Sequence, residues 1–172
     1  KSISIYGSNS AGKSNFLKAF AFMKNFVINS FNNANRNLEI PIAPFLLRKG
    51  FEEKNSLFEV VFFNGITKYR YGFELTKELV TQEWLFYAEP KKREQHYFVR
   101  SGQEIVFNNS WKRSLNIKIE PIIPYVKPKV LFISVLGQFN IDIGNIVVDW
   151  FNKNLVGFDF SNNYFINKTA SL

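Results

Sequence analysis

The chain has 172 residues, a formal net charge of +8 and no cysteine. A hydrophobic content of 46% excludes a disordered chain, and the length suits one domain or a large part of one. Without cysteine, disulfide scaffolds, cysteine zinc sites and thiol catalysis are excluded, and the single histidine, His96, excludes a multi-histidine metal site. No apolar run approaches the ~18 residues of a membrane span, so we expect no membrane partner. The positive charge permits a nucleic-acid partner without requiring one.

The composition points to a bacterial source. Phenylalanine is frequent at 20 residues, and asparagine, lysine and isoleucine are common, which is typical of proteins encoded by AT-rich genomes. No signal-peptide pattern is present, so we expect a cytoplasmic protein. Because Lys1 is no natural start, we expect the chain to be the front part of a longer protein, cut before Lys1 and after Leu172.

A strand and a helix are predicted at the beginning of the chain. Residues 2–6 alternate between polar and apolar side chains, which predicts a short strand. From Ser14 to about residue 30, apolar side chains recur at helical spacing. We expect this stripe to pack against a sheet, and it consists of Phe16, Phe20, Met23 and Val27.

Residues 45–107 predict an antiparallel meander with one buried face. The expected strands are 57–63, 66–75, 79–88, 95–100 and 104–107. Asn64-Gly65 predicts a type I′ turn between the first two strands, because both of its central positions need positive φ. We expect Glu83 and Glu104 to be strand-face carboxylates. The buried face of the second strand consists of Tyr69, Tyr71, Phe73 and Leu75.

The remainder of the chain is harder to interpret. Three prolines make residues 108–128 a poor helix and a poor central strand. Residues 129–139 are apolar and fit a strand or a helix, whereas residues 143–155 carry a helical apolar stripe. We therefore divide the chain into a strand, loop and helix (1–44), an antiparallel β lobe (45–128) and an incomplete helical continuation (129–172).

One motif carries recognisable chemistry. The stretch Gly7-Ser8-Asn9-Ser10-Ala11-Gly12-Lys13-Ser14 matches the phosphate-binding pattern G-x-x-x-x-G-K-[ST], between a predicted strand and a predicted helix. Gly7 and Gly12 let the backbone curl so that successive N–H groups converge on a phosphate, and the following helix directs its positive end there. Lys13 is expected to bridge the β- and γ-phosphates, and the Ser14 hydroxyl to ligate Mg²⁺.

Other nucleotide-binding classes fit less well. A GTPase needs an Asp that reads the guanine base, but Ala170 occupies that place in Asn167-Lys168-Thr169-Ala170. Small-molecule kinases follow the loop with alternating strands and helices, which the predicted meander argues against. A structural turn with no ligand is the remaining alternative for the motif itself.

The motif and the residues after it resemble the loop of ABC/SMC-type ATPases. The third loop residue is Asn9, and Asn15 and an apolar pair follow Ser14, while Ser10 departs from the Gly found in many of these proteins. Within that class, the chain is most similar to ATP-binding proteins of bacterial abortive-infection and anti-phage systems, relatives of the overcoming-lysogenisation-defect ATPases. The further segments that carry this resemblance are 58–62, 69–75, 83–86, 131–134 and 148–151.

The resemblance implies an α/β P-loop NTPase fold, an ABC-type head fragment with a substantial antiparallel β lobe. It implies ATP and Mg²⁺ as cofactors, bound by residues 7–15, with Lys13 stabilising the phosphate charge. It also implies a homodimer in which two heads sandwich ATP and gate an effector or nuclease subunit in phage defence. Gln138 is the candidate for the glutamine that contacts Mg²⁺ in such heads, and a surface or packing role is its alternative.

Hydrolysis in this class requires a Walker B strand, an apolar run that ends in Asp-Glu, and a signature motif of the Leu-Ser-Gly-Gly kind. No Asp-Glu pair and no such signature occur in this sequence. The nearest candidate, residues 146–149, is followed by Trp150 where the glutamate belongs, and the helical stripe explains it better. We therefore expect ATPase activity in the intact parent and none in this chain.

A second hypothesis is a nucleotide-gated nucleic-acid-binding or scaffold module, similar to DNA-repair and SMC proteins, without hydrolysis by this chain. Exposed cations would then contact phosphates, although we favour a solvated loop as the explanation for them. Tyr69, Tyr71 and Phe73 offer rings that stack on bases, with core burial as the alternative. The candidate cations are Lys91, Lys92, Arg93, Lys112 and Arg113.

Overall fold

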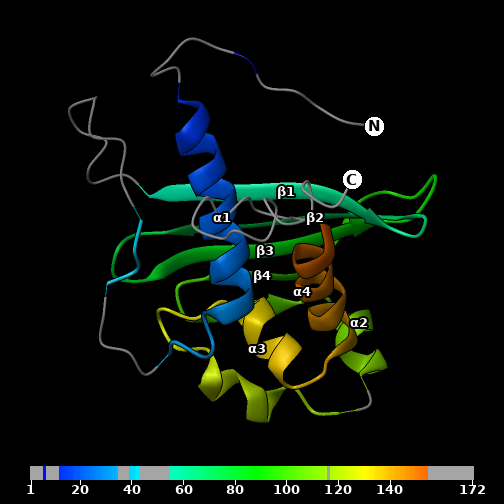
Figure 1. The fold of residues 1–172 in the computed structure, drawn as a ribbon. Coiled ribbons are helices and arrows are strands. Elements are labelled where there is room, and N and C mark those ends of the chain that lie inside the picture. The colour runs from blue at the N-terminus through cyan, green and yellow to red at the C-terminus, as the bar shows by residue number, and fades with distance from the viewer. Residues whose placement is uncertain (1–5, 7–11, 35–38, 43–54, 116, 155–172) are drawn as a thin grey trace, which may run out of the picture.

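The computed structural model describes residues 6, 12–34, 39–42, 55–115 and 117–154. These residues form a mixed α/β fold, as predicted, in which a five-stranded antiparallel sheet of order β1-β2-β3-β4-β5 is combined with helices (Figure 1). The strands are β1 (Ser56–Asn64), β2 (Thr67–Leu75), β3 (Val80–Ala88), β4 (Gln95–Ser101) and β5 (Glu104–Phe107). The helices are α1 (Lys13–Asn29), α2 (Asn109–Ser114), the 3-10 helix η1 (Glu120–Tyr125), α3 (Phe132–Gln138) and α4 (Asp142–Asn154).

The sheet follows from the alternation of side chains along each strand. Each predicted strand is confirmed to within one residue at either end. In β2, the side chains of Tyr71, Phe73 and Leu75 are fully buried and Tyr69 is 5% exposed, so the predicted inner face is correct. The neighbouring register places Phe58 opposite Phe73, which continues the apolar face onto β1.

The prediction for the turn between β1 and β2 was wrong by one residue. Asn64 still belongs to β1 and pairs with Thr67, so Gly65 and Ile66 are the two turn residues. Gly65 has a φ of +59°, whereas neither Asn64 nor Ile66 has a positive φ. Positive φ at the first central position alone is the requirement of a type II′ turn, which glycine meets without strain.

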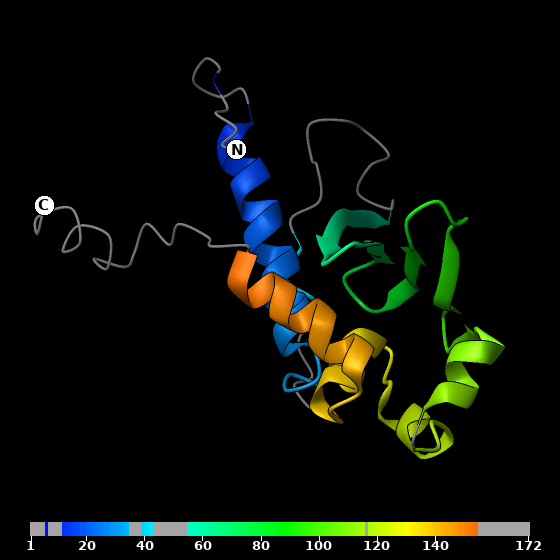
Figure 2. The same ribbon diagram turned by 90° about the vertical axis from the view of Figure 1, so that its right-hand side faces the viewer.

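Helices α1, α3 and α4 cover one face of the sheet (Figure 2). Aromatic rings join the layers: Phe26 of α1 lies 5.7 Å from Phe73, and Trp150 of α4 stacks 4.4 Å from Phe62. Buried side chains from α1, the strands, α3 and α4 form one continuous hydrophobic cluster. The predicted helix is confirmed for residues 143–154, and residues 132–138, which fitted a strand or a helix, are helical.

Only half of the apolar stripe of α1 packs as predicted. Met23 and Val27 are buried against the core, but Phe16 is 48% exposed and Phe20 is 36% exposed. The reason is geometric, because the N-terminal half of α1 extends past β1, the last described strand on that side (Figures 1 and 2). The prediction of core packing is therefore confirmed for Met23 and Val27 and wrong for Phe16 and Phe20.

Two helical segments occupy the region that the prolines made hard to interpret. α2 begins after Asn108, whose side-chain Oδ1 accepts hydrogen bonds from the backbone N–H groups of Ser110 and Trp111. η1 has Pro121 in its first turn, where the missing backbone N–H is tolerated. Within the described ranges, none of the helices has both the length and the apolar character needed to cross a membrane.

A buried ion pair fastens α3 to the sheet. The Glu83 carboxylate lies on the buried face of β3, and it accepts hydrogen bonds from the backbone N–H groups of Phe132 (2.6 Å) and Ile133 (2.9 Å). It also accepts a bond from the Tyr71 hydroxyl at 3.1 Å and faces the Arg100 guanidinium at 3.4 Å. Burial raises the pKa of the Glu83 carboxyl, against the opposing effect of Arg100 and the backbone N–H groups.

The Arg100 guanidinium is itself fully buried and bonded to backbone oxygens. It donates to the carbonyls of Val130 (2.5 Å), Gly102 (2.8 Å) and Lys127 (3.4 Å). No buried side-chain nitrogen or oxygen in the described part of the chain lacks a partner. Glu83 lies on a strand face as predicted, and this face is the buried one, because Glu83 shares it with the buried Leu85 while Arg100 compensates its charge.

Candidate nucleotide-binding site

The C-terminal end of the G-x-x-x-x-G-K-[ST] motif forms the start of α1. Gly12 has φ +85° and ψ 4°, the left-handed conformation that glycine adopts readily and other residues rarely do. Its carbonyl accepts a hydrogen bond from the backbone N–H of Phe16 at 3.0 Å, which starts the helical ladder. The second motif glycine is therefore required by the left-handed backbone conformation directly before the helix.

The helix begins directly at Lys13, so Lys13 and Ser14 lie in its first turn. The N–H groups of a first turn have no partner within the helix and carry the positive end of its dipole. The first turn of α1 contains no acidic residue, and the Gly12 cap has no side chain to accept from these groups. An anion fits at this position, and Ser14 and Asn15 are exposed beside it.

The remaining predicted loop residues lie outside the described residues: Gly7, Ser8, Asn9, Ser10 and Ala11. The structure thus places Gly12, Lys13, Ser14 and Asn15 together at one helix end, and the contribution of the other loop residues stays a prediction. An added Cβ at Gly12 would meet nothing within 4 Å, so the need for glycine here is conformational rather than a matter of space.

Among the described residues, the Ser14 hydroxyl is the candidate ligand for Mg²⁺ at this helix start. They contain no group of three or more acidic, histidine or cysteine side chains able to hold a metal ion. A magnesium ion at this helix start would be held by the Ser14 oxygen, phosphate oxygens and water, an arrangement that suits its preference for oxygen ligands.

The Walker B alternative at residues 146–149 is helical. These residues lie within α4, where Val147 is buried and the Asp149 carboxylate forms an ion pair with Lys153 at 2.6 Å. A Walker B aspartate belongs at the end of a buried strand, so Asp149 does not meet that requirement.

Gln138 is exposed at the C-terminal end of α3. This end of α3 lies near the C-terminal end of α1: the ring of Phe139 is 6.4 Å from that of Phe31, and the Phe31 N–H donates to Ser134 Oγ at 3.2 Å. The 17 residues of α1 span ~25 Å, so the structure does not bring Gln138 next to Lys13. A contact with Mg²⁺ would need another arrangement and stays a prediction.

The candidate phosphate-contacting cations lie on two separate elements. Lys91, Lys92 and Arg93 occupy the exposed turn between β3 and β4, where Lys92 pairs with Glu89. Lys112 of α2 pairs with Glu120 at 2.6 Å, and Arg113 beside it is exposed. All three rings considered for base stacking, those of Tyr69, Tyr71 and Phe73, are buried in the core. Nucleic-acid contact through the cations stays a prediction.

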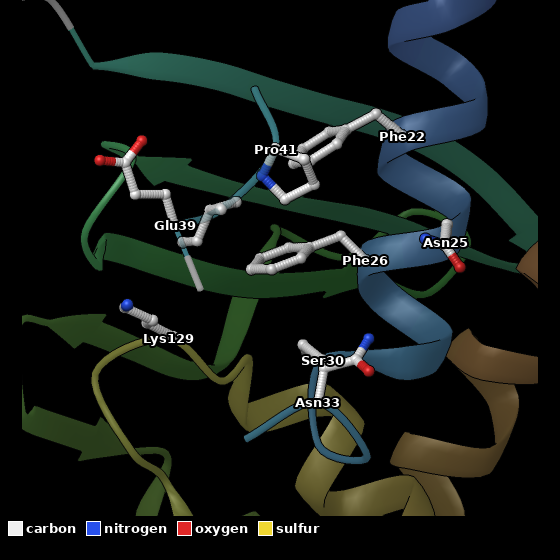
Figure 3. Close-up of a pocket in the computed structure, with 9 residues that line it drawn as sticks. Phe22, Asn25, Phe26, Ser30, Asn33, Glu39, Pro41 and Lys129 are labelled. Atoms are coloured by element: carbon white, nitrogen blue, oxygen red, sulfur yellow. The ribbon is translucent and has the colours of Figure 1, made fainter. Parts of the chain in front are cut away.

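A cavity of about 300 Å³ lies beside the other half of α1 (Figure 3). Phe22 and Phe26 of α1 face Pro41 and Glu39 across it, and Lys129 borders it from the loop before α3. It lies two or more turns along α1 from the Lys13 end. We therefore do not count it as part of the phosphate site.

Three comparisons with known proteins were made. Residues 2–120, more than half of the chain, match the protein family described as "AAA domain, putative AbiEii toxin, Type IV TA system". The searches of curated proteins and of solved structures gave no match. The matched range includes the whole G-x-x-x-x-G-K-[ST] motif and the complete five-stranded sheet.

Proposed function

The chain belongs to this family of AAA domains, and on that premise we propose that it binds the phosphates of ATP with Mg²⁺ at residues 7–15. The observation that carries the proposal is the start of α1. A left-handed Gly12 leads directly into a helix whose first turn holds Lys13 and Ser14 and no acidic residue. This is the arrangement in which a helix end receives a phosphate.

Each residue of the helix start has a distinct role in this proposal. The Lys13 ammonium neutralises charge on the β- and γ-phosphates, and the first-turn N–H groups donate hydrogen bonds to phosphate oxygens. The Ser14 hydroxyl oxygen would hold Mg²⁺, which would neutralise part of the phosphate charge. Gly12 holds the backbone in the conformation that aims these groups at one point.

Ser14 provides a test of the metal part of the site. We expect the wild-type chain to bind ATP about tenfold more tightly with Mg²⁺ than with EDTA. The reason is that one interaction between a polar group, here the Ser14 hydroxyl, and a charged partner contributes about 1.5 kcal/mol to binding. Ser14→Ala removes most of this difference and leaves the affinity in EDTA almost unchanged. Isothermal titration calorimetry in both buffers measures it, and Ser110→Ala, in α2, is the control.

An equal loss of affinity in both buffers would contradict the assignment of Ser14 to the metal. An undiminished magnesium effect in Ser14→Ala would contradict it as well.

We further propose that this chain binds ATP without hydrolysing it at a useful rate. Water activation in such sites is the task of a glutamate after a Walker B strand, and the sequence has no Asp-Glu pair. The described carboxylate nearest to that pattern, Asp149, is paired with Lys153 on an exposed helix face. We expect phosphate release from ATP to stay at the background rate, measured with a coupled phosphate assay. Release above background that Lys13→Ala abolishes would overturn this proposal.

The biological setting that we propose is phage defence. The family description names a putative toxin of a type IV toxin–antitoxin system, which agrees with the resemblance to abortive-infection ATPases. In this setting, ATP held at the start of α1 drives two heads together in the intact parent, and their pairing gates an effector or nuclease. Fold alone does not establish such a role, so its support is the family description and the phosphate site together.

A further inference from the structure

β1 forms one edge of the sheet, and no described residue pairs with its outer side. The strand has nine residues, contains no proline or lysine, and pairs with β2 without a bulge. Three apolar side chains of β1 are at least half exposed: Leu57 (58%), Val61 (50%) and Phe63 (64%). Soluble proteins protect exposed edges with charges, proline or bulges, and β1 has only one charge, Glu59.

The hairpin determines which backbone groups of β1 face this open edge. Asn64 and Thr67 flank a two-residue turn, so they exchange hydrogen bonds with each other. Hydrogen-bonded pairs then alternate along the strand, and the N–H and C=O groups of every second residue point toward β2. The groups that point away from β2 belong to Leu57, Glu59, Val61 and Phe63.

We propose that a second copy of this chain covers the edge, with the two β1 strands antiparallel about a two-fold axis near Val60. In this register Leu57 lies opposite Phe63 of the second copy, and Glu59 lies opposite Val61. All four of these residues direct backbone groups at the open edge, so about eight hydrogen bonds form across the axis. The two sheets become one continuous sheet.

The charge on β1 agrees with self-pairing. Glu59 is the single ionisable residue of the strand, and in this register it meets a valine rather than the other Glu59. Its carboxylate is already held by Arg70 at 3.1 Å and by the Trp84 indole N–H at 2.8 Å. No like charges face each other, and apolar side chains meet on both faces of the joined strands.

The exposed half of α1 supports the same partner. The stripe that packs Met23 and Val27 onto the core continues to the exposed Phe16 and Phe20 in the N-terminal half of α1. This half of the helix extends beyond β1 (Figure 1). A strand added to β1 lies beneath this part of the helix. With a two-fold axis, each copy of α1 covers the β1 strand of the other copy, so one contact buries both exposed features.

The first test is the mass of the full 172-residue chain in solution, with and without ATP. We expect twice the 20.1 kDa of one chain in both conditions, by analytical ultracentrifugation over a concentration series. Val61→Pro removes an N–H that β2 does not use, so the sheet tolerates it, and the dimer weakens about 10-fold to 100-fold because the bond is lost in both copies. Val61→Ala keeps the N–H and is the matched control, which stays dimeric.

The second test needs no variant. Amide protons of Leu57, Glu59, Val61 and Phe63 exchange at least tenfold more slowly at high than at low protein concentration, whereas those of Phe58, Val60 and Phe62 do not change. A single-chain mass at all concentrations overturns the proposal, whether the four amides are unprotected or are covered by another part of the same chain. A folded Val61→Pro that dimerises as strongly as Val61→Ala overturns it as well.

Discussion

Replacing Glu83 by alanine lowers the free energy of unfolding by about 3–5 kcal/mol. The substitution leaves the fully buried Arg100 guanidinium without its counter-charge and the N–H groups of Phe132 and Ile133 without their acceptor. Both losses fall on buried groups, so each carries a desolvation penalty. Since small domains are stable by about 5–15 kcal/mol, this change takes a large part of the total.

Urea denaturation followed by circular dichroism measures this loss. Glu104→Ala is the matched control, because Glu104 is an exposed strand carboxylate and its removal changes the free energy by less than about 0.5 kcal/mol. The double replacement Glu83→Leu with Arg100→Met removes the uncompensated buried charge and recovers part of the lost stability, because the N–H groups of Phe132 and Ile133 still lack their acceptor. An equally small effect of Glu83→Ala and Glu104→Ala would contradict the buried ion pair.

Replacing Lys13 by alanine lowers the affinity for ATP about 100-fold. The ammonium of Lys13 is the only side-chain cation in the motif, and a charged hydrogen bond of about 2.7 kcal/mol corresponds to this factor. Calorimetric titration with ATP and Mg²⁺ measures it. The unfolding curve of the variant is expected to match that of the wild type, because the side chain lies in the first helical turn, outside the core.

Lys18→Ala is the matched control for Lys13→Ala. Lys18 is exposed on the same helix, so its removal changes the net charge equally without touching the helix start. A similar loss of affinity in both variants would show that general positive charge, rather than the motif, attracts the nucleotide.

The strands were predictable because a sheet with one covered face imposes strict alternation. Along β2, Tyr69, Tyr71, Phe73 and Leu75 alternate with polar residues, and the structure buries these four. The turn after β1 was misplaced because Asn64-Gly65 and Gly65-Ile66 both provide glycine, and the register that decides between them is set by pairing of whole strands.

Tertiary packing decided what the sequence could not. The stripe on α1 predicts a helix but not where the described sheet ends, so the exposure of Phe16 and Phe20 was not foreseen. Glu83 had a signal, because it shares a strand face with Leu85, but its partner Arg100 lies on another strand. The short helices α2 and η1 carry too few residues for a periodic pattern to indicate them.

For the site, the motif predicted the helix start at Lys13 to within one residue, because glycine and the change of periodicity mark it. The roles of residues 7–11 and of Gln138 remain predictions, since the former lie outside the described residues and the latter lies near the opposite end of α1.

The central claim is that the start of α1 holds the phosphates of ATP, and backbone amide chemical shifts of the isotope-labelled chain test it most directly. On titration with ATP and Mg²⁺, the largest saturable changes are expected at residues 7–16, and Lys13→Ala is expected to remove them at the same nucleotide concentration. Saturable changes centred instead on the cavity between Phe22, Phe26 and Pro41, or the same changes in Lys13→Ala, would contradict the assignment of the phosphate site.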